Sequence, residues 1–107
     1  MKTKIVNDIV IKLGETDKEN WELIDAAQGK YVWVHLKSFP SGHVIIEDEN
    51  PDKNLLTEAG NFCKEHTKYR KLRHIKVSIT LCNNLKKGAK IGEVFFKKNK
   101  DVKDLIL

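Results

Sequence analysis

The chain has few cysteines, and their spacing does not mark them as metal ligands. Only Cys63 and Cys82 occur among 107 residues, too few for the disulfide framework of a small secreted domain. Zinc sites are marked by closely spaced ligand pairs such as CxxC, and no such pair occurs here. We therefore expect no metal and no cofactor, and we interpret Cys63 as a small buried apolar residue. The scattered residues of ligand type are His35, His43, Cys63, His66, His74 and Cys82.

Long apolar runs are also absent. No stretch approaches the ~20 apolar residues that a membrane-spanning helix requires, and no secretory signal precedes the first apolar residues. At 107 residues and 12.3 kDa the chain is long enough to bury a core without disulfides or metals. These features predict one domain over residues 1–107, binding no membrane, in a reduced cytosolic or nuclear compartment, which we take as the cytoplasm.

No catalytic or phosphate-loop motif is present. Ser41 lies near His43, but the GxSxG turn that exposes a nucleophilic serine is missing. Gly88 and Gly92 lack the spacing of a Walker loop, and neither cysteine lies in a basic setting that would activate a thiolate. We therefore predict that the protein is not an enzyme. A hydrolase that uses His35 and His43 stays open as an alternative.

Arginine is scarce, and the positive charge, which comes mostly from lysine, is concentrated in one half of the chain. Residues 1–63 contain 7 Lys and Arg against 11 Asp and Glu, a net charge of −4, whereas residues 64–107 contain 13 against 4, a net charge of +9. Segregation on this scale indicates an anionic partner. Lysine suits phosphates better than paired contacts to bases, so we expect backbone binding of low sequence specificity. The simpler alternative is a lysine-rich surface that serves only solubility.

The candidate backbone contacts are basic residues in two segments. Residues 83–92 form a polar stretch that we expect to be a flexible loop, and a second basic segment follows the longer predicted helix. A flexible loop with several ammonium groups can follow a chain of phosphates. The residues concerned are Lys86, Lys87 and Lys90 in the first segment and Arg70, Lys71 and Arg73 in the second.

Apolar periodicity predicts an α+β fold with two helices and a mostly antiparallel sheet. A short helix is predicted from Thr16 or Asp17 through residue 27. A longer one is predicted over residues 52–66, with Asn50 as its N-cap and Pro51 at its first position. The apolar stripe of this helix demands burial against the sheet that contains Val77. Strands are expected at residues 8–13, 31–36, 43–46, 75–81, 94–96 and 102–107.

The segment YVWVHLKSFPSGHVII at residues 31–46 is typical of two strands around a turn. Side chains alternate along a strand, so pairing of His35 with His43 would leave Trp33 and both imidazoles on one face. An exposed Trp33 would offer a stacking surface for a base. The alternative is that it packs under a helix, with its indole N–H on a carbonyl. The imidazoles are likewise either nucleic-acid contacts or hydrogen-bonding groups that fix the hairpin.

Three short motifs occur in order: WVH at residues 33–35, PSGHV at 40–44 and NLKKGAKIGEV at 84–94. They follow Leu13-Gly14, Asn20, Leu23 and Ala26-Ala27. This ordered set resembles the NFACT-R domain over nearly the whole chain, from residue 9 to about residue 106. That domain is the C-terminal domain of ribosome-quality-control factors of the RqcH and nuclear-export-mediator type, and it also occurs in short standalone or coiled-coil proteins.

Two departures from the family pattern stand beside the resemblance. Tyr31 occupies the position, two residues before the tryptophan, where the family usually has Asp. The family's Gly-Ser before the second histidine is reversed here as Ser41-Gly42. The role of the missing acidic residue therefore does not carry over, whereas the turn chemistry does.

The resemblance implies a standalone RNA-binding module that acts beside tRNA or ribosomes at stalled nascent chains. It does not extend to alanine tailing, which depends on other domains of the family. We expect RNA, either tRNA or ribosomal, as the partner, together with a protein partner that supplies those other domains. The alternatives are an adaptor that docks a protein through the acidic N-terminal half, and a general binder of DNA or polyanions.

Overall fold

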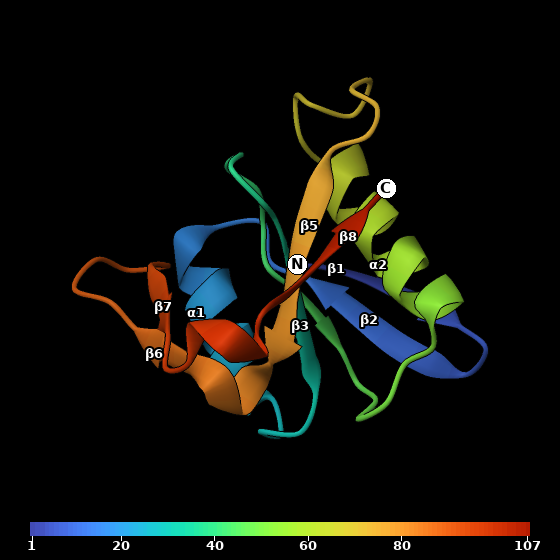
Figure 1. Ribbon diagram of the computed structural model, residues 1–107. Coiled ribbons are helices and arrows are strands. Elements are labelled where there is room, and N and C mark those ends of the chain that lie inside the picture. The colour runs from blue at the N-terminus through green and yellow to red at the C-terminus, as the bar shows by residue number, and fades with distance from the viewer.

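The computed structural model describes residues 1–107 and shows an α+β fold, as predicted (Figure 1). Six antiparallel strands form one sheet in the order β1-β2-β4-β3-β5-β8, and β6 pairs with β7 in a separate two-stranded sheet. No helix is long and apolar enough to cross a membrane. The elements are β1 (Lys2–Val6), β2 (Ile9–Leu13), α1 (Asp17–Ala26), β3 (Val32–Leu36), β4 (Val44–Ile46), α2 (Lys53–Glu65), β5 (Lys76–Leu81), η1 (Cys82–Asn84), β6 (Leu85–Lys87), β7 (Val94–Phe96), η2 (Asn99–Asp101) and β8 (Lys103–Ile106).

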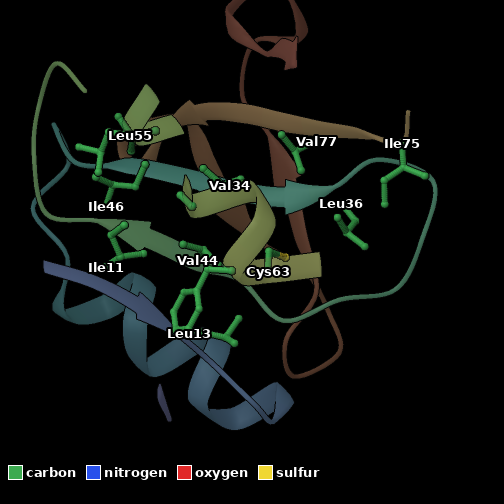
Figure 2. Packing of buried hydrophobic residues seen from close by; sticks show 13 residues of the cluster. Ile11, Leu13, Val34, Leu36, Val44, Ile46, Leu55, Cys63, Ile75 and Val77 are labelled. Atoms are coloured by element: carbon green, nitrogen blue, oxygen red, sulfur yellow. The ribbon is translucent and has the colours of Figure 1, made fainter. Parts of the chain in front are cut away.

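Helix α2 lies across one face of the sheet, as its apolar stripe predicts. The predicted N-cap is wrong by two residues: the Asp52 carboxylate, rather than Asn50, accepts the Leu55 N–H at 2.8 Å. Pro51 therefore precedes the cap. Figure 2 shows Leu55 and Cys63 of the helix among buried residues of the strands, including Val34, Val44 and Val77. This face holds the larger of the two hydrophobic clusters.

The hairpin of β3 and β4 has the predicted register. Val32 pairs with Ile46 and Val34 with Val44, so one further step along the strands brings His35 opposite His43. The alternation is also confirmed, because Val32 and Val34 pack in the cluster beneath α2 while Trp33 packs in the cluster on the other face.

Helix α1 covers the second face of the sheet. Its N-cap is Thr16, whose hydroxyl oxygen accepts the Glu19 N–H at 3.1 Å. Leu23 of this helix packs against Trp33 and Ile45, and Leu85 of β6 joins the same cluster. The β6–β7 hairpin and α1 therefore cover this face together, beside each other in Figure 1.

Two strands were not predicted from the sequence. β1 pairs with β2 through a two-residue turn in which Asn7 and Asp8 have φ of 51° and 66°, the twist that a tight hairpin favours. β6 lies within the segment expected to be a flexible loop, and a 3₁₀ turn, η1, precedes it. The loop expectation is therefore wrong for residues 83–87.

Candidate nucleic-acid interface

The β6–β7 hairpin holds the first group of predicted basic residues. Lys86 pairs with Phe95 and Lys87 with Val94, so two of the three lysines lie on a strand and Lys90 lies in the connection. Glu93 braces that connection, since its carbonyl accepts the Gly88 N–H at 2.9 Å and its carboxylate accepts the Ala89 N–H at 3.1 Å. These contacts restrain the part of the hairpin that presents Lys90.

The three lysines of the hairpin differ in their surroundings. Lys87 Nζ lies 2.5 Å from the Asp25 carboxylate and 5.0 Å from the centre of the Trp21 ring. The Trp21 indole N–H in turn donates to the Glu93 carbonyl at 3.0 Å. Lys87 therefore ties the hairpin to α1, whereas Lys86 and Lys90 are exposed and have no carboxylate within ion-pair distance.

The second predicted group lies elsewhere on the molecule. Arg70, Lys71 and Arg73 are exposed in the segment between α2 and β5. This segment leads into the start of β5, whereas β6 follows its end (Figure 1). A six-residue strand is about 17–20 Å long. The structure therefore does not bring the two basic groups together.

Trp33 is buried rather than displayed. Its side chain is 2% exposed and packs with Leu23 of α1, Ile45 and Leu85, so the packing alternative describes its position and no base stacks on it in this conformation. The expected carbonyl partner is absent, because the indole N–H has no hydrogen-bond acceptor. Phe96 of β7 meets its ring edge-on at 5.5 Å.

His35 and His43 lie beside Trp33 as neutral imidazoles. The His35 and Trp33 rings stack at 5.4 Å, and the two histidine rings meet edge-on at 5.1 Å. Burial lowers the pKa of His35, and burial followed by the nearby His35 lowers the pKa of His43 to about 3. Neutral rings bring no positive charge to a phosphate, so these residues can contribute only hydrogen bonds or packing.

The two histidines have different hydrogen-bonding surroundings. His35 Nδ1 lies 2.6 Å from the Leu36 carbonyl, which favours the tautomer protonated at Nδ1. His43 Nδ1 is buried without a partner, and the His43 backbone N–H donates to the Asn20 side-chain oxygen at 3.1 Å. Both rings line an open hollow of about 480 Å³ between β3 and β7, which Trp33 and Phe96 also border.

The hydrolase alternative gains no support from Ser41. Its hydroxyl donates to the Gly42 carbonyl at 3.0 Å and accepts the Leu36 N–H at 3.2 Å. The Cys63 thiol also donates to this oxygen at 3.3 Å. The serine is therefore held by backbone groups and a buried thiol, with no imidazole positioned to take its proton.

The residues of metal-ligand type do not converge. No three His, Cys, Asp or Glu side chains form a group that could hold a metal ion. Burial raises the pKa of the Cys63 thiol, and it raises that of Cys82 to about 12. Both cysteines are therefore protonated, unreactive thiols at neutral pH in this structure.

Sequence reasoning missed two features of this surface. Phe95 is 56% exposed, beside Lys86 on the outer side of the hairpin. Four lysines in the seven residues that follow β7 line a second hollow beyond the hairpin: Lys97, Lys98, Lys100 and Lys103. The signal was available in the lysine density of residues 97–103. The sequence does not show that these residues pack against the end of β5 in the folded chain.

Comparison with known proteins gives two relatives of this chain. The first is the Rqc2 homolog RqcH of Bacillus subtilis (strain 168), 28% identical over 91 residues that cover 82% of this chain and 16% of that protein. The second is the structure of the C-terminal part of the fibronectin/fibrinogen-binding protein from Streptococcus suis. It is 25% identical with a TM-score of 0.87, over 98% of this chain and 43% of that one. The chain thus spans less than half the length of either relative.

The family model of the NFACT protein RNA-binding domain matches residues 2–98. This range contains WVH, PSGHV and NLKKGAKIGEV, the motifs on which the resemblance rested. It also contains both helices and the complete β6–β7 hairpin. The chain therefore belongs to the NFACT protein RNA-binding domain family.

Proposed function

We propose that the chain binds the phosphate backbone of RNA through the basic surface of its C-terminal half. RNA binding is the property that the family description gives. The observation that supports this location is a difference between the two halves of the chain: most basic residues of the N-terminal half form ion pairs, and most of those in the C-terminal half do not. Of the 7 lysines before residue 64, all but Lys53 have a carboxylate within 4.0 Å: Lys2, Lys4, Lys12, Lys18, Lys30 and Lys37.

The basic residues from position 64 onward are different. Among these 13 Lys and Arg residues, only Lys87 forms an ion pair, with Asp25. The positive charge of this half is therefore largely unneutralised within the molecule. Such a surface attracts an anionic polymer and raises its local concentration. Its positive charge is neutralised when the phosphates of the polymer bind and counterions are released.

Within this surface we assign the first contacts to the β6–β7 hairpin. Lys86 and Lys90 present ammonium groups to a backbone, and Lys87 orients the hairpin through Asp25. Phe95 takes the stacking role considered for Trp33, because its exposed ring lies beside Lys86. Stacking of a base on an aromatic side chain contributes roughly 1–3 kcal/mol. Arg70, Lys71 and Arg73 would reach a separate part of a long RNA.

The cellular setting is the finer part of the proposal. Similarity to RqcH supports a role with tRNA or ribosomes in translation quality control, which would place the chain in the cytoplasm. Because the chain spans 16% of that relative, a protein partner would have to supply any activity of the other domains. The chain itself acts as a non-catalytic binding module.

The test is filter binding to single-stranded RNA at several salt concentrations. Lys86→Gln with Lys90→Gln should flatten the plot of log affinity against log salt by about 1.4, since each phosphate contact contributes roughly 0.7. Lys4→Gln with Lys53→Gln is the matched control, because it removes two positive charges on the α2 side of the sheet, outside residues 64–107. The control pair should leave the slope unchanged.

The same assay separates the competing functions. Equal affinity for RNA, duplex DNA and heparin would favour the general polyanion binder. Unchanged RNA affinity and slope in the Lys86 and Lys90 variant would remove the hairpin from the interface. Absence of RNA binding by the unmodified protein would favour the adaptor that docks through the acidic N-terminal half.

A further inference from the structure

A second hollow lies at the end of β5, beyond the hairpin lysines. Its volume is about 500 Å³, and the residues that line it come from the end of β5, from η1, and from the segment that runs from β7 through η2 into β8 (Figure 1). We call it the lysine hollow. Its lining residues are Thr80, Leu81, Asn83, Asn84, Lys97, Lys98, Lys100, Asp101 and Lys103.

Buried hydrogen bonds hold the lysine-bearing segment in place. The Asn84 side chain, 7% exposed, donates to the Thr80 hydroxyl and to the Lys98 carbonyl at 3.0 Å each, and it accepts the Lys98 N–H at 2.9 Å. The Asn84 carbonyl accepts the Lys97 N–H at 2.8 Å. Thr80, 3% exposed, donates to the Asp101 carbonyl at 2.9 Å. The wall of the hollow is therefore a fixed structure.

The charge of the lysine hollow is unbalanced. None of its four lysines has a carboxylate within ion-pair distance, and Asp101 is the only acidic residue among the nine that line it. Like charges held around one concave surface repel each other, and such a surface focuses the field on an incoming anion. The arrangement costs stability unless an anion occupies it.

The lining also indicates which kind of anion fits. Leu81 is the only apolar residue of the hollow, and no aromatic ring lines it. A nucleotide held by its base would need an apolar or aromatic surface on which to stack. Four separate ammonium groups suit successive phosphates of a polymer, because lysine binds phosphate as a point charge without fixed geometry.

We infer that the lysine hollow binds the sugar-phosphate backbone of RNA as a second contact, separate from the β6–β7 hairpin. This inference rests on the proposed RNA binding and extends it. Asn84 is then a positioning residue, since its side chain is bonded to Thr80 and to the backbone of Lys98. With both contacts engaged, the RNA runs from the hairpin along the chain segment that follows β7.

The experiment compares three double variants in salt-dependent filter binding to single-stranded RNA. Lys98→Gln with Lys100→Gln alters the hollow, and Lys86→Gln with Lys90→Gln alters the hairpin. Lys4→Gln with Lys53→Gln, on the α2 side of the sheet, is the charge-matched control. We expect the hollow variant to flatten the slope by about 1.4, at roughly 0.7 per contact, and to lose affinity roughly tenfold near 0.1 M salt. Melting curves on the same variants should match the unmodified protein or exceed it slightly.

A second measurement keeps the hollow and the proposed function separable. Inorganic phosphate should raise the melting temperature of the unmodified protein more than chloride of equal ionic strength, and the hollow variant should lose most of this difference. A hollow variant that binds RNA as the control does, while the hairpin variant is weakened, would overturn the inference and leave the proposed function standing. Phosphate stabilisation without any RNA binding by the unmodified protein would overturn both.

Discussion

At the residue scale, His43 has a strongly lowered pKa. It is buried between Trp33 and His35, with Nδ1 unpartnered. Its pKa is lowered from 6.5 to about 3 by burial first and by the nearby His35 second. In the unfolded chain His43 therefore becomes protonated near pH 6.5, whereas in the folded chain it becomes protonated only near pH 3.

This difference predicts acid destabilisation. Because the folded pKa is the lower one, the contribution of His43 is complete above pH 6.5 and is lost as pH falls toward 3. At pH 5 the loss is roughly 2 kcal/mol, at 1.36 kcal/mol for each unit of pH below 6.5. Urea unfolding at pH 7.5 and pH 5 measures it. His43→Gln should remove most of the loss, and an equal loss in that variant would show that other groups cause it.

Trp33 gives a second prediction at this scale. Its burial implies that Trp33→Ala costs roughly 3–5 kcal/mol of unfolding free energy through the cavity it leaves. Phe95→Ala, on the exposed side of the hairpin, should leave stability within about 0.5 kcal/mol. It should lower RNA affinity without changing the salt slope, since stacking releases no counterions. Denaturation and filter binding on both variants decide the assignment, and the reverse pattern would return the stacking role to Trp33.

The two alternatives for Trp33 could not be separated from residues 31–46 alone. The alternation of side chains along a strand predicts which residues share a face with Trp33, and the position of the turn predicts that His35 lies opposite His43. Its burial, however, depends on Leu85 and Phe96, which lie more than fifty positions later in the chain. Local periodicity carries no information about a hairpin that folds back from that distance.

At the element scale, the β6–β7 hairpin is held by a few specific contacts. Asn84, just before β6, bonds to Thr80 at the end of β5 and to Lys98 just after β7. Asn84→Ala should therefore destabilise the fold by about 1–3 kcal/mol, because it leaves part-buried backbone groups without partners. It should also weaken RNA binding through Lys98. Urea unfolding checks the stability change, and a value within 0.5 kcal/mol of the unmodified protein would contradict the role given to Asn84.

Two strands, β6 of this hairpin and β1 at the N-terminus, escaped sequence-based prediction. Residues 83–92 contain few apolar residues, so the short strand at Leu85 has almost no periodicity of its own and depends on its partner β7. Helix α2 and strand β5 were predictable because their apolar patterns are longer. For β1 the useful signal was the Asn7-Asp8 pair, which suits the positive φ of a tight turn.

At the scale of the whole molecule, the number of charges could be read from the sequence, but not their pairing. The net charge of residues 64–107 indicated an anionic partner. Which lysines remain unpaired depends on contacts such as Lys37 with Asp104 and Lys87 with Asp25. These pairs join segments that are distant in sequence, so no local pattern revealed them.

The absence of a metal remains a prediction at this scale. A domain that folds around zinc loses its structure when the ion is removed. We expect purified protein to hold no stoichiometric zinc and to keep its circular-dichroism spectrum in a chelator, because apolar clusters on both faces of the sheet support the fold. One equivalent of zinc by elemental analysis, removable only with loss of that spectrum, would contradict this expectation.

The unpaired lysines of the C-terminal half carry the proposed RNA binding. Its sharpest test is the salt dependence of single-stranded RNA affinity for the quadruple variant Lys86→Gln, Lys90→Gln, Lys98→Gln, Lys100→Gln. If the hairpin and the lysine hollow contact separate phosphates, the slope should flatten by roughly 2.8, about the sum of the two double variants, since each contact contributes roughly 0.7. A slope equal to that of the unmodified protein would contradict the account.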